Sequence, residues 1–290
     1  MNIGVVFPQV EIGNDPAAIR DFAQAVEGMG YTHILAFDHV LGANPERPGG
    51  WTGPYTHRHP FHEPFVLFGF LAGVTSRVGL VSGIIILPQR QTALVAKQAA
   101  AVDVLSAGRL RLGVAVGWNA VEFEALGADF HTRGRRIEEQ IDLMRTLWTK
   151  ELVTVRTAEH RISDAGLNPL PVQRPIPIWM GGESEVVQRR TARIADGWMP
   201  HFRPGPEGQA AVDRMHGLVR EAGRDPAKFG IEGRFALMRV PHEEWARETQ
   251  AWRAMRGVTH MSVYTVGLGF KKPQEHVEML RQIQKMIQAG

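Results

Sequence analysis

The chain has 290 residues, of which 44% are hydrophobic, and its formal net charge is +3. This length can bury one large core, and the mild charge argues against a nucleic-acid surface. The absence of cysteine excludes a cysteine nucleophile, cysteine-ligated zinc and a disulfide framework. No apolar run is long enough to span a membrane, and no leader-like segment precedes the first strand. We expect a cytoplasmic enzyme that acts on a small-molecule substrate, with no nucleic-acid or membrane partner.

The N-terminal part alternates predicted strands and helices. Residues 3–7 form a short apolar run typical of a strand. Asp15 and Pro16 predict the start of a helix, because Asp caps helix N-termini and Pro suits the first helical position. This helix should end at Gly30. Residues 33–37 predict the second strand.

A long loop at residues 40–63 is rich in glycine, proline, histidine and tryptophan. Loops of this length in compact domains are usually functional, so we interpret it as a lid-like insertion. His57, His59 and His62 could suggest a metal site. Histidines crowded in a proline-rich loop are more often solvated, and we therefore predict no metal there. A helix at residues 64–75 should follow.

Residues 77–118 carry the clearest pattern in the chain. Residues 78–87 are almost continuously apolar and end before Pro88, as a strand buried on both faces should. An amphipathic helix at about 94–105 should end near Gly108. A second buried strand follows at residues 110–116. This β-α-β unit predicts parallel strands with a right-handed crossover.

The same alternation continues to the C-terminus. A short helical stretch and a helix at 133–148 precede an irregular insertion at residues 150–175 that should contain a hairpin. The remaining predicted elements are strands at 176–180, 197–199, 231–238 and 260–265 and helices that begin near 184 and span 206–222, 242–255 and 273–287. Eight strands and eight main helices predict a (β/α)8 TIM barrel with insertions, in one domain over residues 1–290. An open doubly wound sheet is the alternative, weakened because no G-x-G-x-x-G follows the first strand.

The residues that follow two predicted strands are candidates for chemistry, since barrel enzymes place their active sites at the C-terminal ends of strands. After the second strand, Asp38 could contact a cofactor and His39 could act as an acid or base. Their position is equally compatible with a turn cap and a surface histidine. Trp118, after Gly117, could form a wall for a flat heterocycle or plug the core.

Glycines mark two further positions. Gly83 interrupts a β-branched strand, which can indicate a bulge or the approach of a ligand. Simple packing against a bulky neighbour is the favoured interpretation from the residues alone. Gly181 and Gly182 lie between a strand and a helix that Ser184 can cap. Such a turn either binds a phosphate through backbone N–H groups or only requires positive φ.

Four segments together resemble the luciferase-like monooxygenase superfamily, in particular its coenzyme F420-dependent branch. They read AFDHV; SGIIILPQRQTALVAKQAAAVDVLSAGRLRLGVAVGWNAVEFEALG; RGRRIEEQIDLMRTLW; and PIPIWMGGESEVVQRRTARIADGWMP. The resemblance runs from Ile3 to about Pro200 and returns at residues 221–229. It is highly specific for the superfamily and moderately specific for the F420 branch. The loop at 42–62 and the last sixty residues match no pattern that identifies a substrate.

The resemblance implies a barrel that holds a flavin or deazaflavin at its strand ends. It implies a non-proline cis peptide between Gly83 and Ile84, which replaces the packing interpretation of Gly83. His39 would stand near the hydride-transfer centre, and Asp38 would hydrogen-bond the cofactor. The other implied cofactor-binding residues are Ser82, Gly83 and Ile84; Val116, Gly117 and Trp118; and Gly181, Gly182 and Glu183.

These observations predict an F420-dependent oxidoreductase that transfers a hydride between C5 of the deazaflavin and a small organic substrate. His39 is its predicted proton donor or acceptor. The nearest alternative is an FMN-dependent monooxygenase that uses reduced flavin and oxygen. A further alternative is a non-catalytic cofactor carrier or sensor. A homodimer is expected, because relatives are often dimers.

Overall fold

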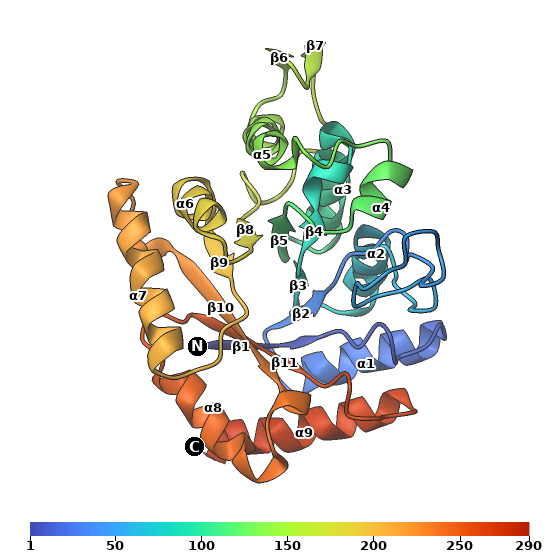
Figure 1. Cartoon of the computed structure of the whole chain (residues 1–290), viewed down its shortest axis with the longest axis vertical. Helices are drawn as coiled ribbons and strands as arrows, with labels where there is room; N and C mark the ends of the chain where they lie inside the picture. The colour runs from blue at the N-terminus through green and yellow to red at the C-terminus, as the bar shows by residue number, and fades with distance from the viewer. Residues whose placement is uncertain (290) are drawn as a thin grey trace.

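The computed structural model describes residues 1–289 and shows eight parallel strands closed into a barrel (Figure 1). The hydrogen-bonded order is β3-β2-β1-β11-β10-β9-β8-β5, and a β3–β5 pairing closes the ring. The strands are β1 (Asn2–Val6), β2 (His33–Ala36), β3 (Gly79–Ser82), β5 (Leu110–Ala115), β8 (Ile178–Gly181), β9 (Gly197–Met199), β10 (Gly230–Ala236) and β11 (His260–Tyr264). The predicted (β/α)8 barrel is confirmed, and the closure excludes the open sheet.

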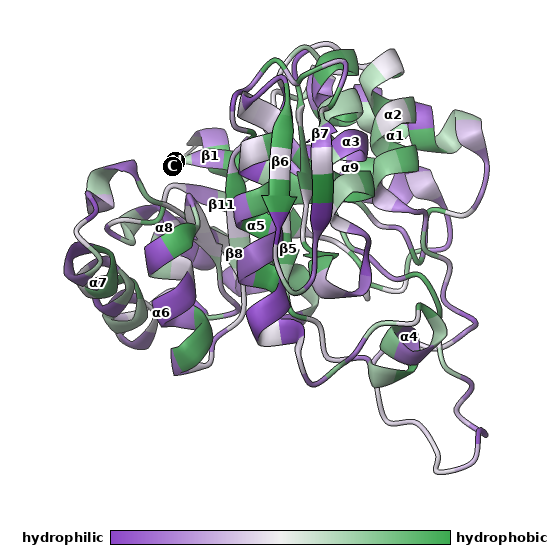
Figure 2. Ribbon diagram, turned by 90° about the horizontal axis from the view of Figure 1, so that it is seen from above, coloured by the Kyte–Doolittle hydropathy of each residue, from purple (hydrophilic) through white to green (hydrophobic). Residues whose placement is uncertain are grey.

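Helices surround the strands, one after each strand of the barrel (Figure 1). They are α1 (Pro16–Gly28), α2 (Pro64–Val74), α3 (Thr92–Leu105), α5 (Arg133–Thr149), α6 (Glu185–Ile194), α7 (Pro206–Glu221), α8 (Trp245–Ala254) and α9 (Pro273–Ala289). The side chain of Asp15 caps α1 as predicted, by accepting from the N–H of Ala17. Hydrophilic and hydrophobic residues alternate along α6 and α7 (Figure 2), as expected of helices with one face on the barrel. None of the described helices is both long and apolar enough to cross a bilayer.

The third strand differs from its prediction. The single strand expected at residues 78–87 is broken into β3 and β4 (Ile85–Ile86), followed by a 3-10 turn. Between the Val81–Arg111 and Ile85–Val114 pairs, this strand advances four residues while β5 advances three. The extra residue is a β-bulge, which apolar periodicity does not reveal because the residues remain buried on both sides of it.

Two insertions leave the barrel. Residues 150–175 contain the predicted hairpin, formed by antiparallel β6 (Val153–Arg156) and β7 (Arg161–Ala165), which projects at the top of Figure 1. The loop at 40–63 contains an isolated bridge between Ala43 and Thr56 but no helix or named strand. In Figure 1 this loop lies beside α2 and next to the short helix α4 (Ala120–Ala125). Neither insertion contributes a strand to the barrel.

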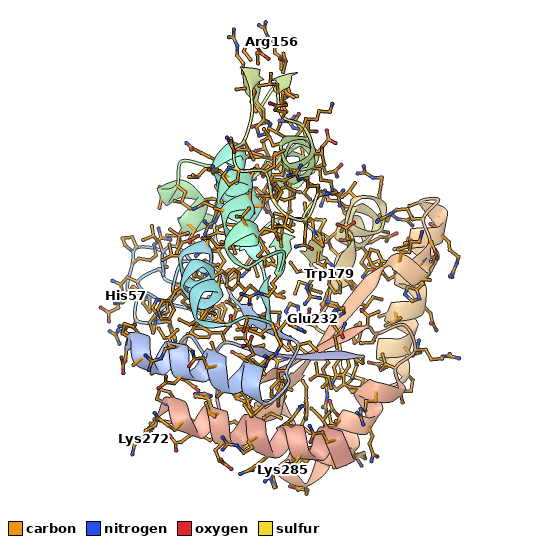
Figure 3. The ribbon with its side chains drawn as sticks, turned by 180° about the vertical axis from the view of Figure 1, so that it is seen from behind. His57, Arg156, Trp179, Glu232, Lys272 and Lys285 are labelled. Carbon is orange, nitrogen blue, oxygen red and sulfur yellow. The ribbon has the colours of Figure 1, made fainter. Side chains whose placement is uncertain are left out.

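A buried ionic cluster lies inside the barrel, towards the N-terminal ends of the strands. Glu232 accepts from Arg111 and from Ser262, and its carboxylate lies 2.9 Å from Nε2 of His33. Burial raises the pKa of Glu232, but Arg111 and His33 together lower it far below its usual range. In Figure 3 Glu232 and Trp179 lie inside the ring, whereas His57 and Arg156 lie at the periphery.

A histidine beside this cluster, His260, makes the stability of the protein depend on pH. Burial and the charge of Arg111 lower the pKa of His260 to about 3, compared with about 6.5 in an unfolded chain. Below pH 6.5 the unfolded state therefore gains a proton that the folded state does not bind. We expect the free energy of unfolding to fall as pH decreases from 6.5 towards 3, by at most about 1.4 kcal/mol per pH unit for each such group.

Thermal denaturation between pH 7 and pH 5 tests this expectation. His260→Asn should reduce the loss of Tm over this interval, because the titrating ring is gone. The same change at the exposed His57 is the control. An equal loss of Tm in wild type and His260→Asn would show that His260 does not contribute.

Candidate active site

A cleft of about 460 Å³ opens at the C-terminal ends of the barrel strands. Parallel strands bring their C-terminal ends to one side of the barrel, so residues distant in sequence meet there. Nine of the expected site residues line the cleft: Asp38, His39, Gly83, Ile84, Val116, Gly117, Trp118, Gly181 and Gly182. Ser82 and Glu183 are not among the residues that line it.

His39 is held in the cleft by a carboxylate that sequence reasoning missed. Its Nδ1 lies 3.3 Å from Oε1 of Glu122, on α4, and only 7% of the His39 side chain is exposed. Because a carboxylate can only accept, we assign the ring proton to Nδ1, which leaves Nε2 free to exchange a proton. The same Oε1 accepts the backbone N–H groups of Val40 and Leu41.

The environment keeps Glu122 ionised although the side chain is fully buried. Burial raises the pKa of Glu122, but the bond to His39 and the N–H groups of Val40 and Leu41 lower it below its usual value. A fully buried glutamate four residues after the Gly117-Trp118 turn carries no distinctive sequence pattern. Helical spacing within the short helix α4 would have been the only signal.

Aromatic rings enclose His39 on the side of the 40–63 loop. The rings of Tyr55 and Phe61 each lie 4.8 Å from the imidazole, and that of Trp118 lies 5.8 Å away. Trp51 packs on Trp118 at 5.7 Å. The insertion therefore covers the imidazole with apolar surface. This arrangement agrees with the lid-like role expected of the loop, and that role stays a prediction.

Asp38 is fully buried, and both of its oxygens have protein partners. Oδ1 accepts from Arg90 at 2.7 Å, and Oδ2 accepts from the backbone N–H of Ile86 at 3.0 Å. Arg90 also pairs with Glu63. Burial lowers the pKa of Arg90, but these two carboxylates raise it above its usual value. Asp38 thus ties β2 to the bulged strand, and the cofactor contact expected of it stays a prediction.

The bulge itself brings three expected residues together. The Gly83–Ile84 peptide is cis, as the resemblance implied. A Cβ on Gly83 would lie 2.2 Å from Leu35, so the packing interpretation is also correct. The hydroxyl of the buried Ser82 donates to the carbonyl of Gly113 and accepts its N–H, which bridges the strands where ladder pairing is interrupted. The cofactor contact of Ser82 stays a prediction.

Gly181 and Gly182 end β8 and precede α6. A Cβ on Gly181 would lie 3.3 Å from Ile84, and Gly182 has a φ of +121°, which favours glycine. The exposed Glu183 accepts the backbone N–H of His201. Gly182 is therefore a turn residue of positive φ beside the cleft, and the role of the glycine pair as a phosphate site stays a prediction.

Basic side chains and a tyrosine line the wall of the cleft that lies across the barrel from His39. These residues were not predicted from the sequence. Arg234 and Tyr264 come from the ends of β10 and β11, and His201 and Arg239 follow β9 and β10. The guanidinium of Arg234 lies over the ring of Phe37, 4.8 Å from its centre. The rule that strand ends carry function could have drawn attention to Arg234, which lies near the C-terminal end of β10.

Comparisons with known proteins agree with this geometry. The family model described as luciferase-like monooxygenase matches residues 1–285. An uncharacterized protein of Mycobacterium tuberculosis is 34% identical over 224 residues, which is 75% of this chain and 77% of the relative. An FMNH2-dependent dimethylsulfone monooxygenase of Pseudomonas fluorescens is 31% identical over 63% of this chain. This chain spans 50% of that relative's length.

Two solved structures have the same fold over nearly their whole length. An F420-dependent secondary alcohol dehydrogenase, in complex with an F420–acetone adduct, has a TM-score of 0.78 at 15% identity and covers 99% of this chain and 98% of its own. The monooxygenase RslO1 of Streptomyces bottropensis has a TM-score of 0.74 at 17% identity, with 97% and 98% covered. At these identities the likeness concerns the fold.

Glu122→Gln tests the bond that orients His39. The amide can still accept from Val40 and Leu41, but it no longer provides an acceptor-only partner for Nδ1. We expect 15N NMR to show a shift of His39 towards a mixture of tautomers, and the free energy of unfolding to fall by about 1–3 kcal/mol. Glu124→Gln, on the exposed face of α4, is the matched control. An unchanged His39 spectrum would contradict the assigned bond.

Proposed function

The chain belongs to the luciferase-like monooxygenase family, and we propose that it is an F420-dependent oxidoreductase. It would transfer a hydride between C5 of the deazaflavin and a small organic substrate. The observation that carries the proposal is the bond between His39 and Glu122. It leaves the second imidazole nitrogen of His39 free at the wall of a largely apolar cleft.

The residues of the cleft fit a flat heterocycle. Its volume of about 460 Å³ lies within the usual range for cofactor pockets. Gly181 places no side chain between Ile84 and Ala115, which leaves a gap with apolar walls. Trp118 and Val116 border the same cleft. α6 begins at Glu185, so its first N–H groups offer donors to a phosphate near the glycine pair.

Each residue would have a distinct task in the reaction. When bound, F420 supplies or accepts a hydride at C5. Nε2 of His39 would exchange a proton with the reacting oxygen of the substrate, and Glu122 would keep the ring in the required orientation. Tyr55 and Phe61 would exclude water from the imidazole. The Asp38–Arg90 pair would hold the bulged strand in place.

An FMN-dependent monooxygenase is the second candidate. It is favoured by the similarity to the FMNH2-dependent dimethylsulfone monooxygenase. The solved structures do not separate the two candidates, because the F420-dependent alcohol dehydrogenase and the monooxygenase RslO1 both match this fold over almost their full length. The two activities differ in chemistry, because a deazaflavin reacts poorly with oxygen. The homodimer and the carrier or sensor alternative stay predictions.

Binding of the two cofactors separates the first two candidates. Fluorescence anisotropy should show F420 binding at least about 10-fold more tightly than FMN, a difference of about 1.4 kcal/mol. The His39→Ala variant should retain its F420 affinity. Its turnover with a panel of small alcohols should fall by about 10²–10⁴-fold, which is the usual contribution of a general acid or base.

Two results would contradict the proposal. Tight binding of FMN without binding of F420 would favour the monooxygenase. Saturable F420 binding with no hydride transfer to any substrate would favour the carrier or sensor.

Gly181→Ala tests whether the glycine wall receives the ring. The added methyl group would lie 3.3 Å from Ile84, in the gap described above, while the backbone φ remains accessible to alanine. We expect the cofactor Kd to rise about 10-fold, since overpacking costs about 1–3 kcal/mol, with little change in Tm. Gly217→Ala on α7, where the Cβ meets no atom within 4 Å, is the control. Equal Kd values for both variants would place the ring elsewhere.

A further inference from the structure

Arg234 is a basic side chain in the cleft that no described carboxylate neutralises. It lies two residues after Glu232 on β10, and the two side chains point to the same side of the strand. Glu232, the nearby acid, is already bonded to Arg111, His33 and Ser262. No ion pair within residues 1–289 includes Arg234. Arg234 is only half-buried, but burial lowers its pKa although the charge of Glu232 raises it. A partly desolvated cation without an ion-pair partner is less stable than a paired one, which indicates that an anion completes this site.

The other acids that line the neighbouring space are also bonded. Asp38 is held by Arg90 and by the backbone of Ile86. Glu248 pairs with Arg203 at 3.2 Å. Glu183 is exposed, accepts the backbone N–H of His201 and lies 3.7 Å from Nδ1 of the same residue. None of these acids forms an ion pair with Arg234 or Arg239 among residues 1–289, so the wall around the two arginines is positively charged.

A second cavity, of about 190 Å³, adjoins the main cleft at this wall. The residues that line both cavities are His201, Arg234, Arg239 and Tyr264. Burial and the charges of Arg234 and Arg239 lower the pKa of His201. Burial raises the pKa of Tyr264 well above its usual value, so its hydroxyl remains a hydrogen-bond donor at neutral pH. The junction between the cavities is therefore built of donors and positive charges.

We propose that His201, Arg234, Arg239 and Tyr264 form an oxyanion subsite that binds a carboxylate, or a chemically equivalent group, of the substrate. This inference rests on the proposed function, in which the cofactor ring occupies the glycine-walled side of the cleft. Tyr55 connects the two parts, because its ring packs on His39 and its pKa responds to Arg234 and Tyr264. An acid held at Arg234 would extend its remaining atoms towards His39. The substrate class is accordingly a small organic acid.

Binding of benzoate and of its neutral analogue benzamide tests the subsite without turnover. Calorimetry on the purified protein, with and without bound cofactor, should show benzoate binding at least about 10-fold more tightly than benzamide. Arg234→Met should abolish this preference and leave benzamide binding unchanged. Arg234→Lys should restore part of it, because lysine keeps the charge and loses the planar fork. Arg156→Met, on the exposed end of β6, is the matched control.

The anionic groups of the cofactor are the other possible source of the ligand. Comparing FMN with riboflavin, and F420 with its deazaflavin lacking the phosphate-linked tail, separates the two sources. The proposal predicts that Arg234→Met leaves all four affinities unchanged. Weaker binding of only the phosphate-bearing cofactors, with benzoate binding intact, would overturn it. So would a wild-type protein that does not distinguish benzoate from benzamide.

The failure of the proposed function gives a different result. In that case F420 would not bind, whether or not FMN binds, and the preference for benzoate would still depend on Arg234. Circular dichroism of Arg234→Met and Arg234→Lys confirms that each variant is folded before its binding is interpreted.

Discussion

The shape of the cleft depends on one buried carboxylate, that of Asp38. It lies at the end of β2 and receives the N–H of Ile86 and the guanidinium of Arg90. A buried carboxylate is stabilised by donors to its oxygens, so these two bonds favour the arrangement in which Ile86 and Arg90 lie beside Asp38. Because Ile86 follows the bulge, the same bonds determine where the third strand resumes after Ser82. The position of Ile84 against Gly181 follows from that constraint.

Charge is distributed unevenly across the barrel mouth. On one side, Glu122 and Asp38 are buried acids whose donors come from within the chain, and they position His39 and the bulged strand. On the other side, no ion pair among residues 1–289 includes Arg234 or Arg239. Between them the wall is apolar or glycine. A ligand that is flat at one end and anionic at the other matches this distribution, as the proposed cofactor and substrate subsites require.

Nine of the eleven expected site residues line the cleft, because they follow strand ends, a position that apolar runs and glycines mark in the sequence. Ser82 was expected to bind the cofactor, but its hydroxyl bridges two strands. Glu122, Arg90 and Arg234 were missed for a common reason. In the sequence, a charged residue that tertiary packing buries cannot be distinguished from one that is exposed to solvent. Only the partners reveal its role. Those of Glu122 and Arg90 lie 83 and 52 residues away along the chain, and Arg234 forms no ion pair among residues 1–289.

The sequence alone determined the alternation of buried strands and amphipathic helices, and with it the barrel, the hairpin insertion and the side of the barrel that carries the cleft. These features follow from local periodicity and from turn chemistry, which neighbouring residues encode. The tertiary structure alone decided the register at the bulge, the partner of His39 and the unpaired charge of Arg234. Each of these depends on which distant groups share a low-dielectric interior. That choice is made by packing around the closed ring and not by any short segment of the chain.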